Sequence, residues 1–372
     1  MSRTPALFAL LSLLPLQLVQ ALPQAASAAS SALPTATAVV PGLNYVAKQA
    51  GKLYFGTATD NPELNDTAYD AILDNNLQFG ALTPANTMKW EYSEPEPFVF
   101  TFEQGDVIAD LARANGMLLR GHNCVWYNEL PAWVTANNYT AAELAIIVAD
   151  RCATLTTHYR GQADAWDVIN EPFNDNGTYR EDVFYNTLGT SYIPIGLRAA
   201  RSGDPNAKLY INEYNNEYIG PKSTALLNLI KELQADGVPI DGVGFQSHFI
   251  VGEVPTTMVE NLAQYAALGL EFAITELDIR MPLPATAEML EQQKADYNYV
   301  VNACLAFSEC VGITVWDWTD KYSWIPSSFP GYGEATPWDA DADCLLQNFV
   351  RKPAYDGIVT AFQNATATST AG

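Results

Sequence analysis

Eight short apolar runs recur along the chain and alternate with segments of helical periodicity. The runs begin at residues 53, 79, 117, 163, 208, 242, 271 and 312. Apolar residues at helical spacing between them predict helices over 103–115, 140–159, 222–236, 256–268 and 286–306. Eight strands alternating with helices over about 330 residues favour the α/β class, as a single (β/α)8 TIM barrel. A doubly wound dinucleotide-binding sheet is not expected, because Gly56 is followed by TATDNP and not by a GxGxxG sequence.

The amino-terminal segment departs from this rhythm. After Arg3, residues 6–19 form an apolar run too short to span a bilayer, and small residues follow it. This layout is typical of a secretory signal peptide, so we expect a secreted, extracellular chain without a membrane partner. The expected segments are a signal peptide over 1–22, an Ala/Ser/Thr/Pro-rich spacer over 23–42, one barrel domain over 43–363 and a tail over 364–372.

Secretion into an oxidising compartment decides how the cysteines are interpreted. Cys304 and Cys310 enclose so short a loop that we expect them to form a disulfide. Cys124 and Cys152 fit a second disulfide or two buried free thiols equally well, and Cys344 would be left over. Candidate N-glycosylation sites of the Asn-X-Thr type lie at Asn65, Asn138, Asn176 and Asn364.

The charge balance argues against several classes of partner. The chain has 42 Asp and Glu against 19 Lys and Arg, a net charge of −23. Nucleic acid and anionic membrane surfaces are therefore poor partners. With 3 His in total, a site with three His ligands would consume all of them, so we expect no metal and no cofactor.

Polar residues gather where the predicted strands end, which is where TIM barrels build their active sites. They are Asn86, His122, Asn170, Glu171, Gln246, His248, Glu276, Asp278 and Trp316. Residues two apart on a strand share a face, so Glu276 and Asp278 should point the same way, as should Gln246 and His248 on the preceding strand. This places His248 against Glu276, with Asp278 able to hold the imidazole.

Two of these side chains, Glu171 and Glu276, are carboxylates that project into one predicted cleft. Glycosidic bond cleavage needs such a pair, one to protonate the leaving oxygen and one to attack or to activate water. Glu129 and Glu213, by contrast, are interpreted as solvated charges or ion-pair partners.

From about Leu43 to Phe362 the chain resembles glycoside hydrolase family 10, the endo-1,4-β-xylanases. The motifs, in the family's order, are NTMKWE from Asn86, GHNCVW from Gly121, WDVINEPF from Trp166, YINEYN from Tyr210, GVGFQSHF from Gly242, ITELDI from Ile274, TVWDWTDKYSW from Thr314 and KPAY from Lys352. Asn-Glu-Pro alone would fit a wider clan of barrel glycosidases, whereas the ordered set is specific. The resemblance implies a monomeric enzyme acting on xylan and xylo-oligosaccharides.

The resemblance also implies retention of configuration by double displacement, with Glu171 as general acid/base and Glu276 as nucleophile. Carboxyl groups about 5 to 5.5 Å apart leave no room for a water between them, so attack is direct. Because like charges repel, we expect Glu171 to be protonated while Glu276 is anionic.

Supporting roles are carried over from the family. His248 and Asp278 would orient Glu276, Gln246 would bond the nucleophile or the sugar beside it, and Asn170 would contact the sugar 2-hydroxyl. Further substrate contacts are expected at Asn86, Lys89, Trp90, His122, Trp126, Trp316 and Trp324. Trp324 is the candidate wall that excludes the hydroxymethyl group of glucose, whereas Trp133, Trp318 and Trp338 are assigned to the core.

Three residues depart from the family pattern. Ala85 stands where an acidic residue is expected, Tyr127 where His is frequent, and Pro172 where a small residue is common.

Two other functions stay open: a broader β-1,4-glucanase or cellulase on the same barrel, and a catalytically silent glycan-binding barrel. The presence of both glutamates argues against the silent barrel.

Overall fold

A computed structural model describes residues 41–340 and 349–370 of the chain. The predicted signal peptide, nearly all of the predicted spacer and Cys344 lie outside the described residues. In the described part, no helix is long and apolar enough to cross a membrane.

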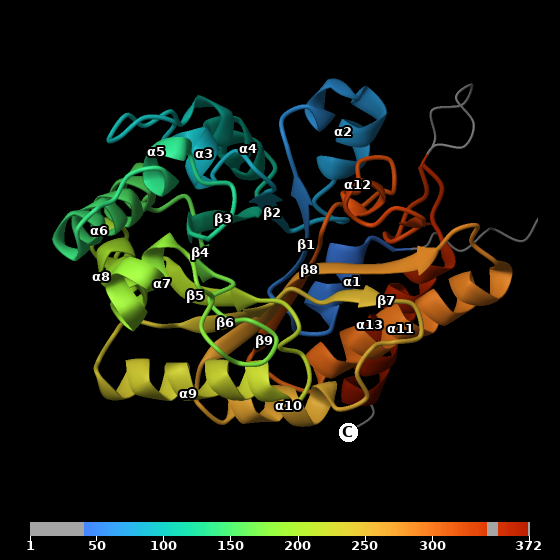
Figure 1. Cartoon of the computed structure of the whole chain (residues 1–372). Coiled ribbons are helices and arrows are strands. Elements are labelled where there is room, and N and C mark those ends of the chain that lie inside the picture. Colours follow the sequence, from blue (N-terminus) through green and yellow to red (C-terminus); the bar gives the residue numbers. More distant parts are fainter. Residues whose placement is uncertain (1–40, 341–348, 371–372) are drawn as a thin grey trace, which may run out of the picture. The chain divides into compact units, whose positions relative to one another are not determined.

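Parallel strands close into a barrel (Figure 1). The barrel strands are β1 (Tyr54–Thr59), β2 (Ala81–Pro84), β3 (Leu118–Val125), β4 (Ala165–Asn170), β5 (Lys208–Glu213), β6 (Gly242–Phe245), β8 (Glu271–Pro282) and β9 (Cys310–Val315). Each pairs with its neighbours in chain order, and β9 pairs with both β8 and β1, which closes the ring. The predicted single (β/α)8 barrel is confirmed, and each apolar run identified in the sequence carries one of its strands.

Two short strands extend the sheet beyond the barrel. β7 (His248–Ile250) follows β6 after a break and pairs in parallel with the carboxyl half of β8. β10 (Tyr332–Gly333) pairs antiparallel with the end of β8. The part of β8 that follows Glu276, including Asp278, is therefore paired with short strands.

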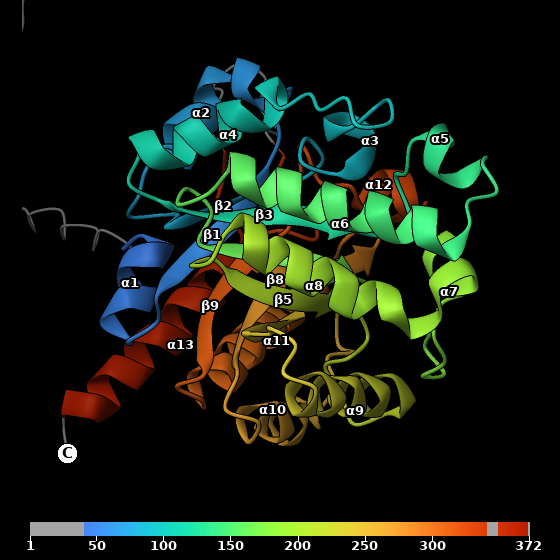
Figure 2. The same cartoon turned by 90° about the vertical axis from the view of Figure 1, so that its left-hand side faces the viewer.

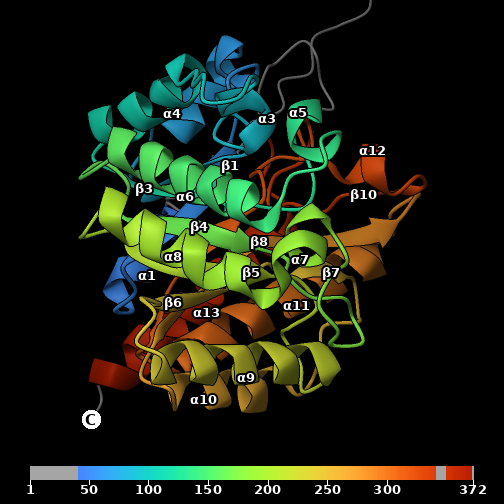
Figure 3. The ribbon, with the colours of Figure 1, turned by 60° about the vertical axis from the view of Figure 1, so that its left-hand side comes forward.

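Helices surround the barrel, and α6 and α8 lie side by side over β4 (Figures 2 and 3). The helices are α1 (Leu43–Gln49), η1 (Glu63–Asn65), α2 (Thr67–Leu73), α3 (Trp90–Ser93), α4 (Glu103–Ala114), α5 (Ala132–Thr135), α6 (Ala141–His158), α7 (Val183–Leu188), η2 (Gly189–Ser191), α8 (Tyr192–Gly203), α9 (Pro221–Ala235), α10 (Met258–Ala266), α11 (Ala287–Leu305), α12 (Ile325–Ser328) and α13 (Pro353–Thr370). The helices predicted from periodicity correspond to α4, α6, α9, α10 and α11.

Local sequence signals explain where several helices begin and end. Thr140 and Glu143 form a capping box at the start of α6, in which Glu143 N–H donates to Thr140 Oγ1 at 3.3 Å and Thr140 N–H donates to Glu143 Oε2 at 2.9 Å. After α9, Gly237 adopts a φ of 61°, a conformation that favours glycine. Helix α13 runs into the segment predicted as a tail, but its side chains over 363–367 are no longer buried.

The barrel interior below the strand ends holds a buried polar layer. Arg120 on β3 forms an ion pair with Asp167 on β4, and its guanidinium lies 4.3 Å from the ring centroid of Tyr210 on β5. Gly121 leaves room for the indole of Trp166, because a Cβ there would lie 2.2 Å from the ring. Asp167 also reaches upward to His122 at the cleft floor, so this layer supports the site above it.

The structure answers the question of cysteine pairing for the described cysteines. Cys304 and Cys310 form a disulfide that joins the end of α11 to the start of β9. Cys124 on β3 and Cys152 on α6 are buried free thiols, so the second disulfide is not formed.

Candidate active site

A cleft of about 640 Å³ opens at the carboxyl ends of the barrel strands. The predicted site residues that line it are Asn86, Lys89, His122, Trp126, Asn170, Glu171, Gln246, His248, Glu276, Trp316 and Trp324. The structure therefore brings together side chains from β3, β4, β7 and β8, from the segments after β2, β3, β4, β6 and β9, and from the loop that leads to α12.

Trp90 is a predicted substrate contact that the structure does not place in the cleft. It begins α3, is 1% exposed, and stacks on Phe184 with ring centroids 5.6 Å apart. Neighbouring residues at the start of a helix point in different directions. Lys89 therefore faces the cleft while Trp90 faces the core.

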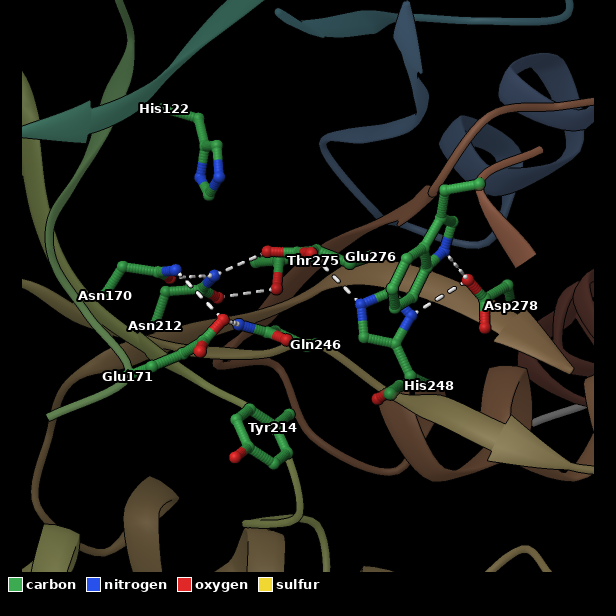
Figure 4. Close-up of polar contacts among 12 residues, drawn as sticks. His122, Asn170, Glu171, Asn212, Tyr214, Gln246, His248, Thr275, Glu276 and Asp278 are labelled. Atoms are coloured by element: carbon green, nitrogen blue, oxygen red, sulfur yellow. Dashed lines mark hydrogen bonds and ion pairs between the residues drawn. The ribbon is translucent and has the colours of Figure 1, made fainter. Parts of the chain in front are cut away.

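Glu276 is held from two sides (Figure 4). Its Oε1 accepts a hydrogen bond from Asn212 Nδ2 at 2.7 Å, and its Oε2 lies 3.1 Å from His248 Nε2. The other imidazole nitrogen, Nδ1, lies 2.9 Å from Asp278 Oδ2, which also accepts from Trp324 Nε1 at 2.8 Å. His248 thus lies between the two carboxylates, as the alternation along β8 predicts.

This arrangement sets the charge of both groups. Burial alone would raise the pKa of Glu276, but the hydrogen bond with His248 and the nearby charge of His122 outweigh it and lower the pKa. Burial would lower the pKa of His248, but Asp278 and then Glu276 raise it to about 10. Glu276 is therefore an anion beside an imidazolium at neutral pH.

Glu171 lies where β4 ends, in a left-handed backbone conformation with a φ of 56°. Its side chain is largely buried, and its Oε1 accepts hydrogen bonds from Asn170 Nδ2 at 3.2 Å and from Gln246 Nε2 at 3.0 Å. Its backbone N–H donates to Asn212 O at 2.9 Å on the neighbouring strand. Both hydrogen-bond donors to the carboxyl group are neutral amides.

Gln246 bonds Glu171 and not the nucleophile; the other contact expected of it, with the sugar beside the nucleophile, stays a prediction. Strand β6 ends at Phe245, and Ser247 has a φ of 63°, so Gln246 and His248 do not continue one regular alternation. The side chain of Gln246 consequently reaches Glu171, while His248 reaches Glu276.

Asn212 is a site residue that the sequence analysis does not single out. Its Nδ2 donates to Asn170 Oδ1 at 2.9 Å as well as to Glu276, and its Oδ1 accepts from Thr275 Oγ1 at 2.7 Å. Asn170 and Asn212 thereby connect the two carboxyl groups through a chain of amides. A Cβ at Gly244 would lie 2.0 Å from Asn212 Oδ1, so glycine is needed on the adjacent strand.

The far end of the cleft holds a second polar network. Asn86 Nδ2 donates to Asp60 Oδ2 at 2.8 Å, and Lys89 Nζ donates to Asn86 Oδ1 at 2.9 Å. Lys89 also pairs with Glu129 and lies 4.9 Å from the ring centroid of Trp126. Glu129 is thus an ion-pair partner, as interpreted from the sequence, and Asp60 is an additional supporting residue.

His122 and Trp316 form the cleft floor. His122 Nδ1 lies 3.0 Å from Asp167 Oδ2, and its ring meets the indole of Trp316 edge-on at 5.3 Å. The sequence analysis does not identify Asp167, although it lies on β4, the strand that carries Asn170.

Glu213 is an ion-pair partner rather than a solvated charge. It is fully buried, and its Oε1 lies 2.8 Å from Lys222 Nζ. Burial acts to raise the pKa of Glu213, and the ammonium group of Lys222 opposes the shift by stabilising the carboxylate. Within residues 41–340 and 349–370, no group of three or more His, Cys, Asp or Glu is arranged to hold a metal ion.

An anionic carboxylate fixed by an imidazolium and a second carboxyl group in the same cleft have the chemistry of a glycosidase pair. The family model for glycosyl hydrolase family 10 matches residues 42–361. Endo-1,4-beta-xylanase A of Phanerodontia chrysosporium is 64% identical over 322 residues, which cover 87% of this chain and 77% of that protein.

Solved structures agree with this match. The xylanase of family 10 from Bispora sp. MEY-1, determined with xylobiose, has 43% identity and a TM-score of 0.84, covering 86% of this chain and 99% of that one. The glycosylated endo-β-1,4-xylanase from Gloeophyllum trabeum has 45% identity and a TM-score of 0.79, with 86% and 99% covered. Because the match spans the whole barrel and every strand that carries the cleft, the chain belongs to glycosyl hydrolase family 10.

Proposed function

We propose that this protein is a secreted endo-1,4-β-xylanase that hydrolyses internal β-1,4-xylosidic bonds of xylan with retention of configuration. The observation that carries the proposal is the pair Glu171 and Glu276 in one cleft, joined by Asn170 and Asn212. The relatives named as endo-1,4-beta-xylanases support the choice of substrate.

In the proposed first step, Glu276 attacks the anomeric carbon while Glu171 donates a proton to the leaving glycosidic oxygen. The bond to the leaving sugar breaks and an ester to Glu276 forms. In the second step Glu171 accepts a proton from water, which attacks the anomeric carbon and releases Glu276. Retention follows because each step inverts the same carbon.

The supporting residues have roles that fit this scheme. His248, charged at neutral pH, keeps Glu276 anionic and orients it, and Asp278 fixes the imidazole. Asn170 bonds Glu171 and is linked through Asn212 to Glu276, and from there it would contact the sugar 2-hydroxyl. Asn86, Lys89, His122, Trp126 and Trp316 would bind sugars along the cleft, and Gln246 would hold Glu171.

Trp324 would favour xylose over glucose by filling the space that a hydroxymethyl group needs. Its indole is fixed, because Nε1 donates to Asp278 and the ring meets His248 and Phe329 edge-on at 5.0 and 5.4 Å. Exclusion of one small group is worth about 1 to 3 kcal/mol. We therefore expect slower hydrolysis of β-1,4-glucans, and not its complete absence.

Secretion and glycosylation are part of the proposal. The disulfide between Cys304 and Cys310 fits an oxidising compartment. The side chains of the four candidate acceptors are exposed; these are Asn65, Asn138, Asn176 and Asn364. The pattern over residues 1–22 supports export by a signal peptide.

The test is a proton NMR time course of hydrolysis of a xylo-oligosaccharide. We expect an internal bond to break first and the β-anomer of the new reducing end to appear before mutarotation. An initial α-anomer would exclude double displacement, and cleavage of a soluble β-1,4-glucan at an equal rate would favour the broader glucanase. The control is Glu276→Gln, which should form neither anomer because it cannot form the ester.

A further inference from the structure

The turn that carries Glu171 uses an unfavourable backbone conformation. A φ of 56° is left-handed, which is unfavourable for a residue with a Cβ. The turn aims the carboxyl group into the cleft. Contacts elsewhere in the structure must therefore hold the backbone in this conformation.

The side chain of Arg180 supplies most of these contacts. Its Nε donates to Glu171 O at 3.0 Å, and its Nη2 donates to Phe173 O at 3.1 Å. The backbone N–H of Arg180 donates to Pro172 O at 2.9 Å. The three successive carbonyl groups of Glu171, Pro172 and Phe173 thus all accept hydrogen bonds from this one residue.

Arg180 also joins the turn to the cleft wall. Its Nη2 donates to Tyr214 Oη at 3.1 Å, and its guanidinium lies 4.1 Å from the ring centroid of Tyr127. Both tyrosines line the cleft, and Figure 4 shows Tyr214 beside Glu171. A planar guanidinium can make these contacts at once, whereas the ammonium group of lysine cannot reproduce its fixed geometry.

A second, independent contact holds the amide side of the same turn. The N–H of Phe173 donates to Glu213 Oε2 at 3.1 Å, and Glu213 is itself fixed by Lys222. This contact fixes Phe173 but leaves the carbonyl of Glu171 to Arg180. Loss of the Arg180 side chain would therefore free the carbonyl of Glu171, while the N–H groups of Glu171 and Phe173 keep the loop attached to Asn212 and Glu213.

We propose that Arg180 is a positioning residue for the general acid/base Glu171, and this rests on the proposed function. Proton transfer requires the carboxyl group within hydrogen-bond reach of the leaving oxygen, so a small displacement reduces the rate steeply. The nucleophile Glu276 belongs to another strand and has its own partners. Substitution of Arg180 should consequently slow proton donation by Glu171 and leave nucleophilic attack by Glu276 unchanged.

Leaving groups separate these two effects. A dinitrophenyl β-xylobioside releases a weakly basic phenolate that needs no proton, whereas a phenyl β-xylobioside needs one. For Arg180→Met we expect kcat/KM on the phenyl substrate to fall by about 10- to 100-fold, and on the dinitrophenyl substrate by less than about 3-fold. Arg180→Lys should show the same selectivity with a smaller loss, and it decides the question if Arg180→Met does not fold.

The matched control is Arg198→Met. Arg198 is an exposed arginine on α8 that also donates to backbone carbonyls, those of Asp236 and Gly237, outside the cleft. We expect unchanged kcat/KM on both substrates. Equal loss on both substrates in the folded Arg180 variants, or no loss on either, would overturn the proposal. A wild-type protein that hydrolyses neither xylobioside would instead contradict the proposed function.

Discussion

The two carboxyl groups of the site differ in the charge of the groups that bond them. Glu276 bonds an imidazolium and one amide, while Glu171 bonds two neutral amides. A hydrogen bond from a charged donor stabilises an anion more strongly than one from a neutral donor. Neighbouring side chains thus assign the anionic role to Glu276 before any substrate binds.

The raised pKa of His248 predicts a pH dependence of stability. Its pKa is about 10 in the folded protein and about 6.5 in the unfolded chain, so folding favours the charged form. The resulting stabilisation is complete below about pH 6.5 and is lost as pH rises through about 10. Urea unfolding at pH 6 and pH 10 should show a larger decrease in the free energy of unfolding for wild type than for His248→Asn.

The difference between the two proteins isolates this histidine together with Glu276, whose pKa it lowers, because groups that do not contact His248 titrate equally in both. The expected excess decrease is on the order of a few kcal/mol. Parallel pH profiles for the two proteins would show that His248 is not preferentially charged in the folded state.

Alternation along a strand predicts some site residues and fails for others, for a structural reason. It correctly places His248 against Glu276 and Asp278, because β7 and β8 are regular there. It does not reveal that Gln246 and His248 bond different carboxyl groups, because Ser247 is left-handed and interrupts the alternation. It overlooks Asn212, whose importance depends on its register opposite Asn170, which no single strand reveals.

At the scale of elements, the strand and helix order is readable from the sequence, while the loops that carry the site are not. Buried parallel strands produce continuous apolar runs, so every barrel strand is recognisable. Helix α8 is not predicted, and it carries Pro194 in its first turn, where a missing N–H leaves no helical bond unmade. The prediction that Trp90 contacts the substrate is wrong because α3 is a single turn, and the direction in which its side chains point depends on the tertiary fold.

The link between α11 and β9 offers a prediction for an element outside the cleft. The disulfide there encloses a short loop, and Lys52 Nζ donates to the carbonyls of Phe307 and Cys310 in the same loop at 2.7 and 2.9 Å. Replacing both cysteines by alanine should lower the free energy of unfolding by about 2 kcal/mol.

Activity should not change in this double variant, because the disulfide lies at the start of β9 and the cleft at its end. Chemical denaturation gives the stability, and kcat/KM on a xylo-oligosaccharide gives the activity. If adding a reductant to wild type leaves the difference between the two proteins intact, the disulfide is not its cause.

The whole molecule carries a net charge of −23, which acts on charged substrates over distances longer than any contact. Xylan that bears glucuronic acid is also anionic, so we expect repulsion at low salt. The Debye length is about 30 Å at 0.01 M salt and about 10 Å at 0.1 M. Activity on glucuronoxylan relative to neutral xylan should therefore rise between these salt concentrations.

The ratio of initial rates on the two polymers is the measurement, since it cancels any general effect of salt on the enzyme. A constant ratio would mean that the long-range field does not influence productive binding. A rise of both rates together would point to an effect on the protein itself.

Helices α1 and α13 lie beside each other, and Tyr355 Oη donates to Pro41 O at 2.7 Å (Figures 1 and 2). The first helix of the barrel domain is thus held against its last helix. A circular permutant that joins the end of α13 to the start of α1 by a linker, and that begins in an exposed surface loop, would keep the same strand order around the barrel. The order of the strands around the barrel therefore does not depend on where the chain begins and ends.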